Sequence, residues 1–160
     1  MQSRAKLLGH PVHPMLVAFP IGLLAASLVF DLIAMAGGPT QLGFAAFWCI
    51  AGGVVFGLLA AVFGLVDWLG IEPGTRAKRV GLWHAIINVI VVGLFSISWL
   101  VRLGVTQHQP MWFPVALEIV AIVLLLISGW LGGELVDRLG IGIDDGAHPN
   151  ARSSLRDKHA

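Results

Sequence analysis

Four long apolar stretches divide the chain, separated by short segments that are polar or contain Gly and Pro. They cover residues 13–35, 42–69, 82–103 and 112–139. At 1.5 Å per helical residue, each can cross the roughly 30 Å hydrocarbon core of a bilayer. The pattern predicts an all-α protein whose four transmembrane helices form a bundle over residues 1–141, with the lipid bilayer around it.

Two of these stretches carry polar side chains at both ends with the same spacing. The separation of His13 and Asp31 in the first stretch equals the separation of His84 and Arg102 in the third. In a helix this separation makes about five turns, so the two members of each pair share one face and lie roughly 27 Å apart. We therefore expect one polar group near each membrane boundary.

The equal spacing belongs to a longer internal repeat. When the first stretch is moved along the chain until His13 meets His84, Ser27 also falls on Ser98. The VDWLGI that ends the second stretch matches the VDRLGI that ends the fourth at nearly the same offset. The matches predict two tandem helix hairpins in a parallel repeat, related by a pseudo-two-fold axis along the membrane normal.

Basic residues are distributed unevenly between the two ends of the expected helices. Nine of the ten Lys and Arg residues fall on the side that carries both termini, and only Arg102 falls on the other. The positive-inside rule then predicts that both termini are cytoplasmic. The polar tail, residues 142–160, has little apolar content and is predicted to be disordered in the cytoplasm.

The composition agrees with an integral membrane protein. Of 160 residues, 57% are hydrophobic and 12% are charged, and the mean hydropathy is +0.86. A chain of this size and composition leaves no room for a soluble catalytic domain. The single Cys49 excludes a disulfide framework. No nucleophile–base pair, phosphate loop or dinucleotide fingerprint is present, so the sequence supports no enzyme activity beyond an electron-transfer component, and we predict no catalytic residues and no nucleic-acid partner.

The expected topology gathers polar side chains at the cytoplasmic ends of the helices. His13 and His84 would face each other across the pseudo-axis, and two facing imidazoles can be the axial ligands of haem b. A non-haem site for a transition metal ion would use more nitrogen and oxygen donors. The candidate metal ligands are His10, His13, His84, Asp67 and Glu134. A structural or proton-linked role for the histidines is the third interpretation.

The opposite ends of the helices predict an ion pair. Asp31 and Arg102 occupy equivalent positions of the repeat, and a salt bridge between them would lower the cost of holding either charge near lipid. Glu118, about two turns into the fourth stretch, is expected to join them. Ser27 and Ser98 are expected to bond within their own helices or to each other. The alternative to a structural role here is a gate or proton relay.

Several motifs resemble a known family. GHPVHP at residues 9–14, LWHAIINV and SGWLGGELVDRLGIG are similar to a bacterial family of predicted four-helix membrane proteins of unknown function, over about residues 8–143. The resemblance implies the bacterial inner (cytoplasmic) membrane. Some members of that family are similar in architecture to fusions with Rieske-type iron–sulfur domains, which implies membrane redox work. This chain lacks the paired Cys-His boxes of such a domain.

Together these patterns predict a redox-associated membrane protein that binds haem b or a metal through His13 and His84. It would exchange electrons with a redox partner protein or a quinone, and a homo-oligomer is compatible with this role. Two alternatives stay open from the sequence. One is a carrier of small solutes or ions, including a proton-linked carrier, and the other is an accessory membrane subunit without a ligand.

Overall fold

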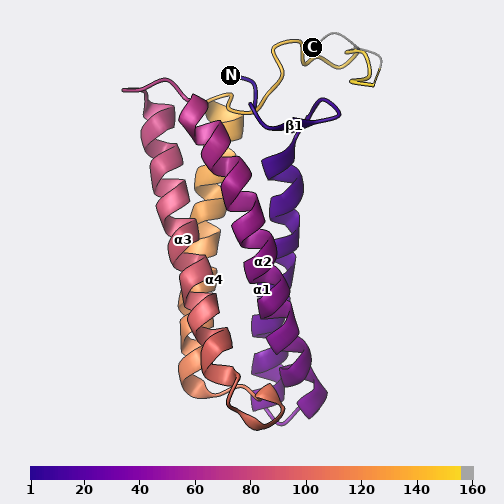
Figure 1. Ribbon diagram of the computed structural model, residues 1–160, viewed down its shortest axis with the longest axis vertical. Coiled ribbons are helices and arrows are strands. Elements are labelled where there is room, and N and C mark those ends of the chain that lie inside the picture. The colour runs from indigo at the N-terminus through magenta and orange to yellow at the C-terminus, as the bar shows by residue number, and fades with distance from the viewer. Residues whose placement is uncertain (156–160) are drawn as a thin grey trace.

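The chain folds into a bundle of four long helices that run alternately up and down (Figure 1). A computed structural model describes residues 1–155. The helices are α1 (Val12–Met35), α2 (Thr40–Gly70), α3 (Arg76–Arg102) and α4 (Trp112–Gly133). All four are long and apolar enough to cross a membrane, which confirms the predicted all-α membrane bundle.

Short elements lie at the two ends of the bundle. They are the antiparallel pair β1 (Lys6–Leu7) and β2 (His10–Pro11), the 3-10 turn η1 (Thr106–His108) and the π-helical turn η2 (Glu134–Arg138). We call the end that carries both termini and residues 71–75 the basic end, and the end that carries residues 36–39 and 103–111 the opposite end (Figure 1). Within the predicted tail, residues 156–160 lie outside the described residues, and the disorder of the tail stays a prediction.

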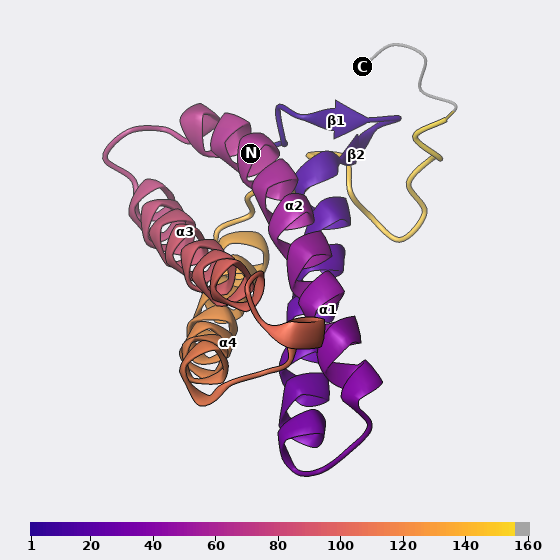
Figure 2. The ribbon, with the colours of Figure 1, turned by 60° about the horizontal axis from the view of Figure 1, so that its bottom comes forward.

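The bundle consists of two hairpins. α1 packs mainly on α2, and α3 packs mainly on α4, with the two pairs side by side (Figure 2). Gly37, with φ of 93°, reverses the chain after α1, and the Gly38 N–H donates to the Ile33 carbonyl at 2.9 Å. These are the features of a glycine C-cap, which directs α2 back along α1. The predicted duplication of the hairpin stays a prediction.

An apolar core fills the middle of the bundle between the two polar ends. Its members come from all four helices and are buried: Leu24, Ile50, Val91, Phe95 and Ala121. Gly53 on α2 lies directly against the Leu24 side chain. Small residues of this kind let neighbouring membrane helices approach closely, which favours tight packing without polar bonds.

The outer surface of the bundle is also apolar. Val62 on α2, Val89 on α3 and Leu126 on α4 are 59%, 67% and 70% exposed. In water such a surface would be costly, whereas lipid chains cover it without loss. The outer surface thus supports association with a lipid bilayer.

The start of α3 differs from the sequence prediction. The apolar pattern predicts a helix from residue 82, but α3 begins earlier, at Arg76. The Thr75 hydroxyl accepts a hydrogen bond from the Lys78 backbone N–H at 3.1 Å. This cap satisfies an amide that the first turn leaves free, so the helix extends beyond the apolar stretch into its basic flank.

Candidate functional site

The two predicted histidines face each other at the basic end of the core. His13 lies in the first turns of α1, and His84 lies on α3. Their ring centroids are 6.3 Å apart, with 86° between the ring planes. We call these two residues the histidine pair. One member comes from each hairpin, so the pair bridges the interface between the hairpins.

Each ring is held by a carbonyl of the other helix in its own hairpin. His13 Nδ1 is 2.8 Å from the Ala60 carbonyl, and His84 Nδ1 is 2.9 Å from the Ser128 carbonyl. A carbonyl oxygen only accepts hydrogen bonds, so Nδ1 carries the hydrogen and Nε2 carries the lone pair. In both rings, Nε2 is therefore the nitrogen that can accept a hydrogen bond or bind a metal.

A glycine lies under each ring. A Cβ atom at Gly64 would come within 2.9 Å of His13 Cε1, and one at Gly132 within 3.3 Å of His84 Cε1. In both hairpins this glycine follows the anchoring carbonyl residue by about one helical turn. The rings can lie flat against α2 and α4 because no side chain stands in their place.

The surroundings of the two rings differ in polarity. The Asn88 side-chain amide Nδ2 lies 3.1 Å from His84 Nε2 and donates to the His84 carbonyl at 2.9 Å. The Ser128 hydroxyl lies 3.0 Å from His84 Nδ1. Among the bonds of the described residues, His13 has its Ala60 anchor alone. Both nitrogens of His84 therefore have protein partners, whereas Nε2 of His13 has no hydrogen-bond partner among the described residues.

The other three predicted metal ligands are bound elsewhere. His10 on β2 lies 3.3 Å from the Ser154 hydroxyl. Asp67 accepts hydrogen bonds from Ser3 Oγ at 2.8 Å and from the next two backbone amides. Glu134 pairs with Arg76 at 2.6 Å. The structure brings together His13 and His84 alone, and in residues 1–155 no three His, Cys, Asp or Glu side chains are grouped to hold a metal ion.

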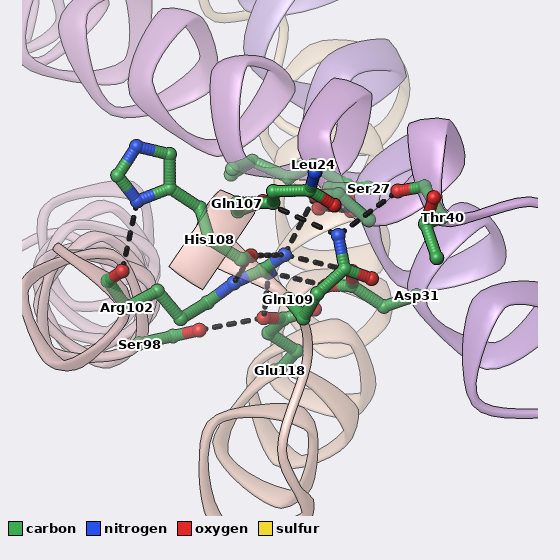
Figure 3. Close-up of polar contacts among 11 residues, drawn as sticks. Leu24, Ser27, Asp31, Thr40, Ser98, Arg102, Gln107, His108, Gln109 and Glu118 are labelled. Carbon is green, nitrogen blue, oxygen red and sulfur yellow. Dashed lines mark hydrogen bonds and ion pairs between the residues drawn. The ribbon is translucent and has the colours of Figure 1, made fainter. Parts of the chain in front are cut away.

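The predicted ion pair at the opposite end is confirmed. Arg102 Nη1 and Nη2 donate to the two carboxylate oxygens of Asp31 at 2.5 and 3.0 Å, a bidentate pair (Figure 3). Glu118 joins, as predicted, with its Oε1 3.5 Å from Arg102 Nη1. All three side chains are buried with no exposed surface. We call Asp31, Ser98, Arg102 and Glu118 the charged cluster.

The two serines of this region behave differently from each other. Ser27 donates to the Leu24 carbonyl of its own helix at 2.8 Å, as predicted. The prediction for Ser98 was wrong, because its hydroxyl donates to Glu118 Oε1 on α4 at 2.6 Å. Oε1 of Glu118 has free acceptor capacity, whereas a backbone carbonyl of α3 is already bonded within the helix, so the Ser98 hydroxyl donates to α4.

His108, for which the sequence patterns predicted no role, covers the charged cluster. Its carbonyl accepts from Arg102 Nε and Nη2 at 3.0 and 2.8 Å. Its ring stacks on Phe47 at 3.9 Å between centroids, and its Nδ1 lies 2.9 Å from the Arg102 carbonyl. His108 and Gln107 both have φ of 54°, an unusual backbone for residues other than Gly.

Four apolar membrane-spanning helices with polar clusters at both ends define a multi-pass membrane protein. The chain belongs to the family of predicted membrane proteins designated DUF2231, whose sequence model matches residues 9–145. No curated protein and no solved structure matches the chain.

Proposed function

We propose that the protein is a redox-associated membrane protein whose His13 and His84 together ligate one metal centre, with haem b as the preferred group. This proposal rests on the close approach of His13 and His84 across the interface between the two hairpins. Two imidazoles on facing helices are a common ligand set inside helical bundles.

The two rings lie close enough for one metal ion to reach both. Imidazole nitrogen lies about 2.0 Å from a bound metal, and the ring centroids of His13 and His84 are 6.3 Å apart. Each histidine would use Nε2, because Nδ1 is bonded to a carbonyl. The carbonyl anchors on both Nδ1 atoms are the outer partners that metal-binding histidines use to fix ring and tautomer.

One contact has to change when a metal binds. The Asn88 amide now occupies the lone pair of His84 Nε2, which is the atom that would bind the metal. Asn88 would release this nitrogen, while the bond from its amide to the His84 carbonyl can persist. The Ala60 and Ser128 carbonyls would then orient the two imidazoles, and a bound haem would supply one-electron transfer.

A single centre near one face cannot carry electrons through the membrane. The spacing along α1 and α3 puts the histidine pair roughly 27 Å from the charged cluster. Electrons would therefore pass to a second centre, either a redox partner protein or a quinone in the bilayer. The excess of Lys and Arg at the basic end supports a cytoplasmic location for the pair in a bacterial inner membrane.

A difference spectrum tests this proposal. Detergent-purified protein produced with haem supply is expected to give a b-type reduced-minus-oxidised band that both His13→Ala and His84→Ala lose. His148→Ala, an exposed histidine outside the bundle, is the matched control and should keep the band. His10→Ala then reports whether His10 takes part. A colourless protein would overturn the proposal of haem binding. Elemental analysis of the same sample would then show whether a transition metal ion is bound instead.

A proton-linked carrier is the second candidate, and the buried charged cluster favours it, because ionisable groups inside a membrane protein often mark an ion path. The apolar core between the two ends opposes a continuous path within one subunit. Reconstituted liposomes that acidify or take up solute with the wild type, but not with Glu118→Gln, would favour the carrier over the redox proposal.

A further inference from the structure

The charged cluster contains more negative than positive charge. Two carboxyl groups, Asp31 and Glu118, face a single guanidinium, Arg102, and all three are buried. From the other elements packed here, α2 contributes the thiol of Cys49 near Asp31 and η1 contributes the imidazole of His108. A thiol and a neutral imidazole add no positive charge to the cluster. With both carboxyl groups ionised, the cluster would hold one uncompensated negative charge.

Most N–H groups of Arg102 are bonded to partners other than Glu118. Nη1 and Nη2 hold Asp31 in a bidentate pair, and Nε and Nη2 also donate to the His108 and Gly43 carbonyls. The contact with Glu118, at 3.5 Å, is longer than a good hydrogen bond. The free energy cost of a second buried carboxylate is therefore left largely uncompensated.

One oxygen of Glu118 lacks a partner. Ser98 satisfies Oε1 at 2.6 Å, whereas Oε2 is buried with no hydrogen-bond partner in the described part of the chain. Asp31 and Glu118 both contact Nη1 of Arg102, and two carboxylates are both acceptors and cannot bond each other. A proton on Glu118 supplies the missing donor and removes the excess charge in one step.

We propose that Asp31 and Glu118 form a proton-binding site in which one proton is carried by Glu118 and shared with Asp31. The new bond is the O–H of the Glu118 carboxyl group, and the bond that breaks is an O–H of a hydronium ion at the opposite end of the bundle, which leaves a neutral water molecule. Asp31 keeps its negative charge, which Arg102 neutralises. This site is separate from the histidine pair and does not depend on a metal there.

Residues 106–109 close this site. The His108 carbonyl lies on Arg102, and its ring stacks on Phe47. Gln109 fastens the segment to α2 through a hydrogen bond from Nε2 to the Thr40 carbonyl at 3.0 Å (Figure 3). The two consecutive residues with φ of 54° make the closed segment strained. The proton therefore exchanges with water when this segment opens.

Infrared spectroscopy tests the proton. At neutral pH the wild type is expected to show the carbonyl band of a protonated carboxylic acid, and Glu118→Gln should lose it. Glu134→Gln, at the basic end, is the matched control and should keep it. Carboxyl-labelling of all Glu with ¹³C in the wild type should shift the band, and labelling of all Asp should not. This second measurement needs no folded variant. A missing band, or one that only the Asp label shifts, overturns the proposal.

Deuterium exchange of the same band tests the closing segment. Gln109→Ala removes the bond to Thr40, and exchange should become about fivefold faster, the effect of losing one hydrogen bond of ordinary strength. Gln41→Ala, an exposed glutamine in the first turn of α2, is the control and should exchange like the wild type. Equal rates in Gln109→Ala and the wild type would show that this segment does not close the site.

Discussion

The two ends of the bundle hold their polar side chains in opposite ways. At the basic end, His13 and His84 are part-buried, and each ring has one carbonyl anchor. At the opposite end, Arg102 is entirely buried and bonded to Asp31 and to two backbone carbonyls. The first arrangement leaves Nε2 of His13 without a protein partner in the described residues, and the second commits most donors of Arg102 to the protein itself. We infer that a metal or haem would bind at the basic end and that stability depends more on the opposite end.

Removal of Arg102 is expected to have the largest effect and tests whether stability depends on the opposite end. Arg102→Met leaves two buried carboxyl groups without their cation, and we expect the free energy of unfolding in detergent to fall by about 3–5 kcal/mol. Arg138→Met, which removes an exposed arginine at the basic end, should change it little. Equal losses in the two variants would mean that the charged cluster does not dominate stability.

Substitution of Gly64 and Gly132, the glycines that lie against the two rings, compares the two histidines within the basic end. The new Cβ in Gly64→Ala would meet His13 Cε1 at 2.9 Å, so the ring has to move, at a cost of about 1–3 kcal/mol. Gly132→Ala, at 3.3 Å from His84, should cost less. Gly22→Ala, with nothing within 4 Å, is the control. Thermal unfolding and the NMR signals of the imidazoles measure all three, and a larger effect at Gly132 would contradict the expected order.

Asp67 tests how firmly the N-terminal segment is held to the basic end. Its carboxylate accepts from Ser3 Oγ and from the backbone amides of Arg4 and Ala5. Asp67→Ala should lower the free energy of local opening by about 1.5–3 kcal/mol, the range for one bond to a charged group. Protease cleavage before residue 12 should become faster, whereas Asp137→Ala, at an exposed position, should leave cleavage unchanged.

The smallest expected effect concerns Asp144, outside the bundle. The backbone N–H of Gly146 and the Lys6 ammonium hold the pKa of this carboxyl below its ordinary value. The stabilisation that the ionised Asp144 gives to this segment is therefore present above about pH 4 and is lost as the pH falls through the lowered pKa. Amide exchange at Gly146 should accelerate only at that acid pH. Asp144→Asn should remove the pH step, and a step that persists in this variant would assign it to another group.

The sequence predicted the His13–His84 and Asp31–Arg102 pairs because helix periodicity is a local property. A spacing of about five whole helical turns puts His13 and Asp31 on one face whatever surrounds the helix. The matched offset then brings His84 to His13 and Arg102 to Asp31. Four apolar stretches long enough to cross a bilayer left few alternatives to a helical membrane bundle.

What the sequence did not predict depends on tertiary contacts or on unusual backbone. No spacing rule gives His108 or Gln107 a positive φ, and no pattern reveals the stacking of His108 on Phe47. The partners of Ser98 and Asp67 lie on other elements, so their bonds could not be read from a single helix. These local departures gather at the two ends of the bundle, where loops and side chains determine the geometry together.

The apolar core has an electrical consequence. In an energised membrane the potential falls mainly across low-dielectric material, and a full crossing changes the energy of one charge by about 2.3 kcal/mol per 100 mV. Between the two ends that material is the layer of Leu24, Ile50, Val91, Phe95 and Ala121. An electron gained on one side of this layer, or a proton gained on the other, travels through little of the field. Each end is therefore expected to respond to its own aqueous compartment and only weakly to voltage.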